Sequence, residues 1–153
     1  MRRAEHHSRA LQTVAAAVVI AALIFAVALA TFLPANRDTL RVHLGTLRTS
    51  MAEALTLARA DDERRVGRSF FDTELGLLRD DMTSTQQALA GARPLPELRE
   101  RFAETARIAA TAADAMRILA LPGARAESVI AGQATLVGLQ SRVQEMEQEL
   151  QAR

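Results

Sequence analysis

The side chains of this chain that could carry chemistry are few and widely separated. There is no cysteine among its 153 residues, so a thiolate metal site, a disulfide framework and a cysteine nucleophile are excluded. His6 and His7 lie in the N-terminal tail, and His43 has no His, Cys or acid at metal-ligand spacing. The acidic runs 61–63 and 80–81 lack the spaced oxygens and the glycine turn of a calcium loop. We therefore expect no metal site.

Sequence motifs for catalysis and for phosphate binding are missing as well. The chain has no glycine-rich phosphate loop, no nucleophile elbow and no paired carboxylates in a plausible cleft. Its charges nearly cancel, with a net charge of +1, and aromatic residues make up only 3% of it. A nucleic-acid binder would need a basic face and aromatic side chains for stacking. We predict a protein that is not an enzyme, needs no cofactor and binds no nucleic acid.

The longest uncharged segment of the chain, TVAAAVVIAALIFAVALATFL, covers residues 13–33. As a helix these 21 residues span about 31 Å, close to the roughly 30 Å of a bilayer's hydrocarbon core. We predict a transmembrane anchor in the lipid bilayer. The alternative is a leader that is cleaved after the small-x-small triplet at residues 28–30. The apolar region of a leader has only about 7–15 residues, which favours the anchor.

The basic residues that flank this run predict its orientation. Three arginines in the tail, residues 1–12, favour a cytoplasmic N-terminus, although three more arginines follow soon after the run. All 19 basic residues are arginine, which together with the alanine content is typical of a GC-rich bacterial genome. We therefore expect a single-pass protein of the cell inner membrane, with residues 34–153 in the periplasm.

Small residues recur every four positions along the predicted membrane helix, at Ala22, Ala26 and Ala30. Such a stripe lets two membrane helices approach closely and pack by van der Waals contact. The alternative is chance, because an alanine-rich run produces this spacing by accident. Both interpretations stay open.

Beyond Pro34 the apolar residues recur at alternating spacings of three and four, which is typical of helices packed along a shared seam. Breaks are predicted at residues 91–96 and 122–123, where proline and glycine gather. Four stripes result, and their members are Leu40, Leu44, Leu47, Met51, Ala54 and Ala58; Phe71, Leu75, Leu78, Met82, Thr85 and Leu89; Leu98, Phe102, Thr105, Ala109, Ala112, Met116 and Leu119; and Val129, Gly132, Leu136, Leu139, Val143, Met146 and Leu150.

The first two stripes are out of phase, because 13 residues separate Ala58 from Phe71, one short of two heptads. Either the chain turns near residues 61–69, or one helix of about 50 residues continues through a discontinuity. A turn gives helices of matched length. We therefore predict an all-α fold in which an antiparallel four-helix bundle follows the anchor, and the alternative is a long helix plus a helical hairpin.

The last helix has a coiled-coil pattern that suggests a homodimer. In a parallel dimer Arg142 at position g would pair with Glu147 at position e of the partner. The residues that we expect to associate are Leu136, Leu139, Arg142, Val143, Met146, Glu147 and Leu150. The alternative is that the same stripe is the inward face of the bundle.

A basic tail, a membrane helix and matched amphipathic helices resemble the first half of bacterial chemoreceptors and sensor histidine kinases. The resemblance covers nearly the whole chain, but it concerns architecture only and implies no ligand-binding residue. It implies an extracytoplasmic four-helix sensor. In those receptors a second membrane helix and an output domain follow, whereas this sequence stops at Arg153.

Two functions follow from this pattern. The first is a non-enzymatic accessory or assembly subunit that is anchored in the membrane and presents its helices to a protein partner. The second is a receptor-type sensory module whose output domain is missing or supplied by another chain. The sequence favours the first function.

Overall fold

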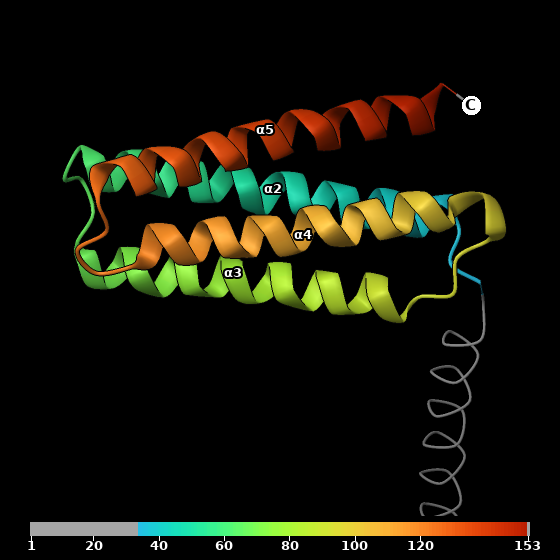
Figure 1. Ribbon diagram of the computed structural model, residues 1–153, viewed down its shortest axis with the longest axis horizontal. Coiled ribbons are helices and arrows are strands. Elements are labelled where there is room, and N and C mark those ends of the chain that lie inside the picture. The colour runs from blue at the N-terminus through green and yellow to red at the C-terminus, as the bar shows by residue number, and fades with distance from the viewer. Residues whose placement is uncertain (1–33, 153) are drawn as a thin grey trace, which may run out of the picture. The chain divides into compact units, whose positions relative to one another are not determined.

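Four long helices make up the part of the chain that the computed structural model describes, residues 34–152 (Figure 1). They contain between 22 and 26 residues each, and a single 3-10 turn precedes the third of them. Their bounds are α2 (Arg37–Asp62), α3 (Arg68–Gly91), η1 (Pro96–Leu98), α4 (Arg99–Ala120) and α5 (Ala126–Gln151). Residues 34–152 contain no β-strand, so the predicted all-α class is confirmed for this part of the chain.

The four helices form an antiparallel bundle, in which each helix runs opposite to the one before it (Figure 1). Helix α2 packs against α3 and α5, and α4 packs against the same two helices. Helices α2 and α4 also touch each other across the middle of the bundle. The four-helix bundle is therefore confirmed, and the alternative of one helix of about 50 residues is wrong.

The chain reverses between α2 and α3 without any proline. Arg64 adopts a left-handed backbone conformation, with a φ angle of 54°. The next amide, of Arg65, donates to the carbonyl oxygen of Ala60 at 2.8 Å, and the amide of Arg64 donates to Asp61 at 2.9 Å. These bonds satisfy carbonyl groups that the end of a helix leaves free. A left-handed residue therefore ends helix α2 here, where other helices end at a proline.

The predicted apolar stripes form the core of the bundle. Every member of the first three stripes is buried, and so are Gly132, Leu136, Val143, Met146 and Leu150 of the fourth. Val129 and Leu139 are partly buried and pack against the core. The stripe on α4 is wider than predicted, because Ile108 and Ala115 are buried too. Helix α4 contacts three other helices, which explains the additional burial.

The start of the bundle is fixed to the connection between α3 and α4. The amide of Ala35 donates to the carbonyl oxygen of Arg93 at 3.0 Å, and the amide of Leu95 donates to the carbonyl oxygen of Ala35 at 3.2 Å. Asn36 then caps α2, since its Oδ1 accepts a hydrogen bond from the amide of Thr39 at 3.0 Å. These bonds hold the first residues of the bundle in place.

The predicted anchor at residues 13–33 lies outside the described residues, as do the tail at 1–12 and the stripe of Ala22, Ala26 and Ala30. Within residues 34–152 no helix combines the length and the apolarity that crossing a bilayer requires. The anchor, its orientation and the periplasmic location therefore stay predictions from the sequence.

Candidate functional site

The apolar residues proposed for self-association lie on the inner side of α5. Leu136 and Val143 are fully buried, Met146 and Leu150 are almost so, and Leu139 is partly buried against the same core. The structure thus brings these five side chains together, but against α2 and α4 of their own chain. This arrangement corresponds to the alternative in which the stripe is the inward face of the bundle. A second copy could reach these residues only if the bundle opened.

The two charged residues proposed for the dimer seam have partners inside the bundle. Arg142 donates from Nε to Oε1 of Glu104 on α4 at 2.8 Å, and from Nη1 to Oε2 of Glu145 at 3.0 Å. Glu147 accepts from Nη1 of Arg48 on α2 at 2.7 Å. These ion pairs connect α5 to both of its neighbours. They orient the last helix within one chain.

His43 and the acidic side chains are the titratable groups of the bundle that could support metal or acid–base chemistry. Within residues 34–152 no three His, Asp or Glu side chains gather as they would around a metal ion. His43 lies half-buried on α2, and this burial lowers its pKa below the usual value of 6.5. A lowered pKa keeps the imidazole neutral at physiological pH. His43 has no acidic partner with which to act as a general base in any contact that the structure records.

A small polar crevice of about 150 Å³ lies at the end of the bundle where α2 turns into α3. Arg68 is its central residue. It donates from Nη1 to Asp61 at 3.2 Å and from Nη2 to the carbonyl oxygen of Ala120 at 3.2 Å. Its guanidinium also lies over the ring of Phe71, 4.8 Å from the ring centre. These contacts join the ends of α2, α3 and α4 through the side chain of Arg68.

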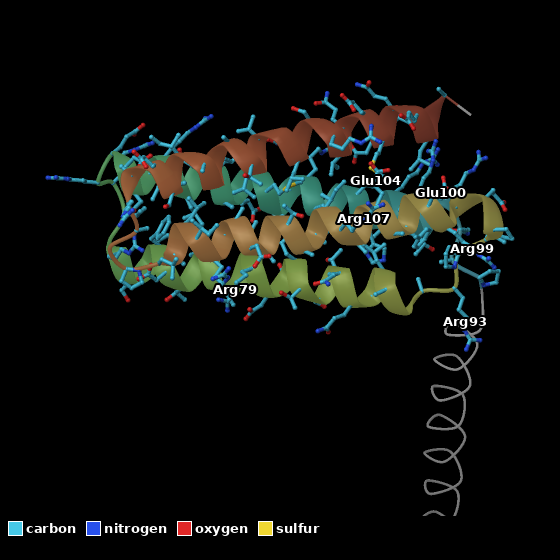
Figure 2. All side chains as sticks on the ribbon, viewed as in Figure 1. Arg79, Arg93, Arg99, Glu100, Glu104 and Arg107 are labelled. Carbon is cyan, nitrogen blue, oxygen red and sulfur yellow. The ribbon has the colours of Figure 1, made fainter. Side chains whose placement is uncertain are left out.

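An open groove of about 700 Å³ lies at the opposite end, along the connection from α3 to α4. Leu89, Pro94 and Phe102 contribute apolar surface to it, and Arg93 and Arg99 are part of its lining. Figure 2 shows Arg93 on the connection and Arg99 at the start of α4. The groove is open to solvent, so it offers a surface rather than an enclosed site.

One surface of the bundle that could contact a partner is the outer side of α5. Its exposed residues at spacings of four and three form what we call the outer stripe: Ile130, Ala134, Val137, Ser141, Gln144, Gln148 and Gln151. None of these seven residues is charged, although charged residues make up 24% of the chain. Ile130 and Val137 are large apolar side chains that are 64% and 48% exposed. These two apolar side chains, one heptad apart on an uncharged stripe, make this face a candidate interaction surface.

The outer side of α4, unlike the outer stripe of α5, carries charged residues. Its exposed residues include Arg107, Asp114 and Arg117, and Figure 2 shows Arg107 beside Glu104 and Glu100 along this helix. Such a charged face is what a helix in contact with solvent is expected to have.

Sequence reasoning overlooked the outer stripe because the inner stripe of α5 is the more apolar of the two. A signal was nevertheless present: residues 128–141 form a run of 14 residues without a charge. A helix without charge over such a run has more than one side that could pack against another element. The sequence alone did not say which side of this helix the bundle would use.

No family model matches this chain, and the comparisons found no matching curated protein or solved structure.

Proposed function

We propose that this protein is a single-pass membrane protein without enzymatic activity, which acts as an accessory or assembly subunit and presents its helical bundle to a protein partner. The observation that carries the proposal is the outer stripe of α5, an uncharged and partly apolar face on a bundle whose own core is already complete. A face of this kind is stabilised when another helix covers it.

The sequence supports the membrane location of this function. Residues 13–33 form an uncharged run long enough to cross a bilayer, and Ala35 begins the bundle only two positions after the run. An anchor in this run would tether the bundle to the membrane, where it could contact the domains of other membrane proteins. The N-terminus would lie in the cytoplasm, and the bundle in the periplasm of a bacterial cell.

Co-purification tests the accessory function directly. The full-length chain, extracted from its native membranes in a mild detergent, should retain a second membrane protein in a fixed stoichiometry. A matched variant with Val137→Arg on the outer stripe should lose that protein, whereas Thr111→Arg on the outer side of α4 should keep it. If the wild-type chain is purified with no other protein under conditions that preserve known complexes, the accessory function is wrong.

One observation favours a receptor-type sensory module as the second candidate. Nη2 of Arg41, near the start of α2, donates to the carbonyl oxygen of Leu150 near the end of α5 at 3.1 Å. The bundle therefore begins and ends at the same end, an arrangement that the resemblance to chemoreceptors also implies. A ligand for such a module would co-purify with the protein. Native mass spectrometry that finds a stoichiometric small molecule would favour this candidate over the first.

A further inference from the structure

We infer that the open groove along the connection from α3 to α4 binds an anionic phospholipid, whose phosphate contacts Arg93 and Arg99 while an acyl chain lies against the apolar lining. This inference goes beyond the proposed function, which names a protein partner, and it rests on that function only for the membrane location. The groove belongs to α3, α4 and their connection, whereas the outer stripe belongs to α5.

The lining of the groove is mostly apolar and built from small side chains. Leu89 and Phe102 are only 3% and 2% exposed, so they form its floor. Pro94 and four alanines complete the apolar lining: Ala90, Ala92, Ala103 and Ala106. An alanine side chain ends at Cβ and leaves space that a larger residue would fill. The volume of about 700 Å³ lies within the range of small-ligand sites, roughly 300–1,000 Å³, so the groove has room for part of an acyl chain.

All the charge on the lining is positive. Arg93 and Arg99 are the charged members of the nine residues that line the groove, and both are exposed. Figure 2 shows them at the end of the bundle where α3 is connected to α4. The acids nearest to them in the sequence, Glu97 and Glu100, are not part of the lining, and Glu97 lines a separate small crevice. The groove therefore offers positive charge beside apolar surface.

Neither arginine is neutralised by a carboxylate of the bundle. The ten ion pairs within residues 34–152 use arginines such as Arg68, Arg101 and Arg142, but not Arg93 or Arg99. A guanidinium presents a planar set of N–H donors that matches the oxygens of a phosphate group. Two such groups on one groove are therefore suited to a phosphate ligand.

The combination of charge and apolar surface selects the class of ligand. Inorganic phosphate would contact the two arginines and leave the apolar lining exposed to water. A neutral alkyl chain would cover the lining and leave the arginines without a partner. A phospholipid with a net negative charge satisfies both parts of the groove at once.

The chain enters the bundle beside this groove. The amide of Ala35 donates to the carbonyl oxygen of Arg93 at 3.0 Å, and the amide of Leu95 donates to the carbonyl oxygen of Ala35 at 3.2 Å. The backbone of Ala35 therefore lies against the connection that supplies Arg93 and Pro94 to the groove. An anchor at residues 13–33 would tether the protein to the bilayer through Ala35, which favours a membrane lipid over a soluble anion as the ligand.

Replacing the two arginines tests the phosphate contact. The full-length chain is purified in mild detergent and titrated with phosphatidylglycerol, and native mass spectrometry counts the bound lipids. Arg93→Gln and Arg99→Gln should each weaken the binding of one lipid by about fivefold, the factor expected for one basic residue near an anionic surface. The binding of phosphatidylcholine with the same acyl chains should not change, because this lipid has no net charge.

Arg59→Gln combined with Arg125→Gln is the matched control for the double variant of Arg93 and Arg99. Both control residues are exposed, lie at the opposite end of the bundle and take part in none of the ten ion pairs. The control loses the same charge and should bind phosphatidylglycerol as the wild type does. Arginines of the N-terminal tail are present in every variant, so they affect all measurements alike. Equal losses in the two double variants, or no loss in either, would overturn the inference.

A third substitution tests the contact with the acyl chain. Ala103→Phe fills part of the groove without changing its charge and should weaken the binding of phosphatidylglycerol, whereas Ala131→Phe on an exposed position of α5 should not. Circular dichroism verifies that all variants remain helical. If Ala103→Phe binds as the wild type does, or if sodium phosphate displaces the lipid at matched ionic strength, the groove is not a phospholipid site. Carbonate washing tests the membrane location separately, so a failure of the proposed function is distinguished from a failure of this inference.

Discussion

Arg142 on α5 and Glu104 on α4 form an ion pair in which both Nε and Nη2 of the guanidinium lie 2.8 Å from the same carboxylate oxygen, Oε1. The hydrogen bonds to Glu104 and to Glu145 raise the pKa of Arg142 above its usual value. The pair joins two helices of one chain, where the coiled-coil pattern had suggested a bond between two chains. It therefore lies on the side of α5 that faces its own bundle.

Breaking this pair should affect the stability of one chain and leave its association state unchanged. Glu104→Gln and Arg142→Gln should each lower the free energy of unfolding by about 0.2–1 kcal/mol, the usual range for a solvent-exposed pair. The double variant should cost no more than either single variant if the two side chains act mainly on each other. Chemical denaturation measures the energies, and sedimentation in detergent measures the mass. A change in the sedimenting mass of the single variants would contradict this assignment.

The left-handed residue in the turn between α2 and α3 predicts a stabilising substitution. Arg64→Gly should raise the free energy of unfolding by about 0.5–1 kcal/mol, because glycine adopts a positive φ without the steric cost that other residues incur. Arg64→Ala removes the same side chain but keeps the Cβ atom, so it should give no such gain. If both variants have equal stability, the backbone at this position is not left-handed.

Two glycines inside helices should respond differently to alanine. Gly76 on α3 has no atom within 4 Å of the position that a Cβ would occupy. Gly76→Ala should therefore stabilise the protein by about 0.5–1 kcal/mol through helix propensity. At Gly132 on α5 an added Cβ would lie 3.2 Å from Cδ2 of Leu119, which is itself buried. Gly132→Ala should therefore raise the free energy of unfolding by less than Gly76→Ala does. Thermal unfolding followed by circular dichroism compares the two, and equal gains would show that α4 and α5 are less closely packed than described.

The lowered pKa of His43 predicts how stability depends on pH. Because burial keeps this imidazole neutral in the folded state, the unfolded chain takes up the proton first as the pH falls through about 6.5. The free energy of unfolding should therefore decrease below that pH. His43→Gln should remove this part of the decrease and leave the contribution of the carboxylates. Denaturation at pH 8 and pH 5.5 measures the difference. If the free energy of unfolding falls by the same amount in the variant and in the wild type, His43 is excluded as the cause.

The apolar run at residues 13–33 predicts that the protein stays in the membrane. The full-length chain should remain in the membrane pellet after alkaline carbonate washing, and its mature form should keep Met1 or Arg2 at the N-terminus. Sequencing that finds Thr31 at the N-terminus would show that a leader has been cleaved. That result would restore the leader hypothesis and remove the membrane location from the proposed function.

The sequence by itself determined the helices and their inward faces. A helix repeats every 3.6 residues, so an apolar stripe such as Phe71, Leu75 and Leu78 identifies its buried side from local spacing alone. Proline and glycine likewise marked the ends at residues 91–96 and 122–123, because they act on the backbone at their own positions. Both properties depend only on residues that are near each other in the chain.

Only the tertiary structure decided which helices became neighbours. The heptad pattern placed Arg142 beside a seam but could not say whether the opposite charge would come from another copy or from Glu104, 38 positions earlier. The same holds for α5 as a whole, which has an uncharged stripe on each of two sides. Periodicity identifies both, but the side-by-side order of the helices fixes which one α2 and α4 cover. That order arises from contacts between distant segments, and it leaves Ile130 and Val137 exposed.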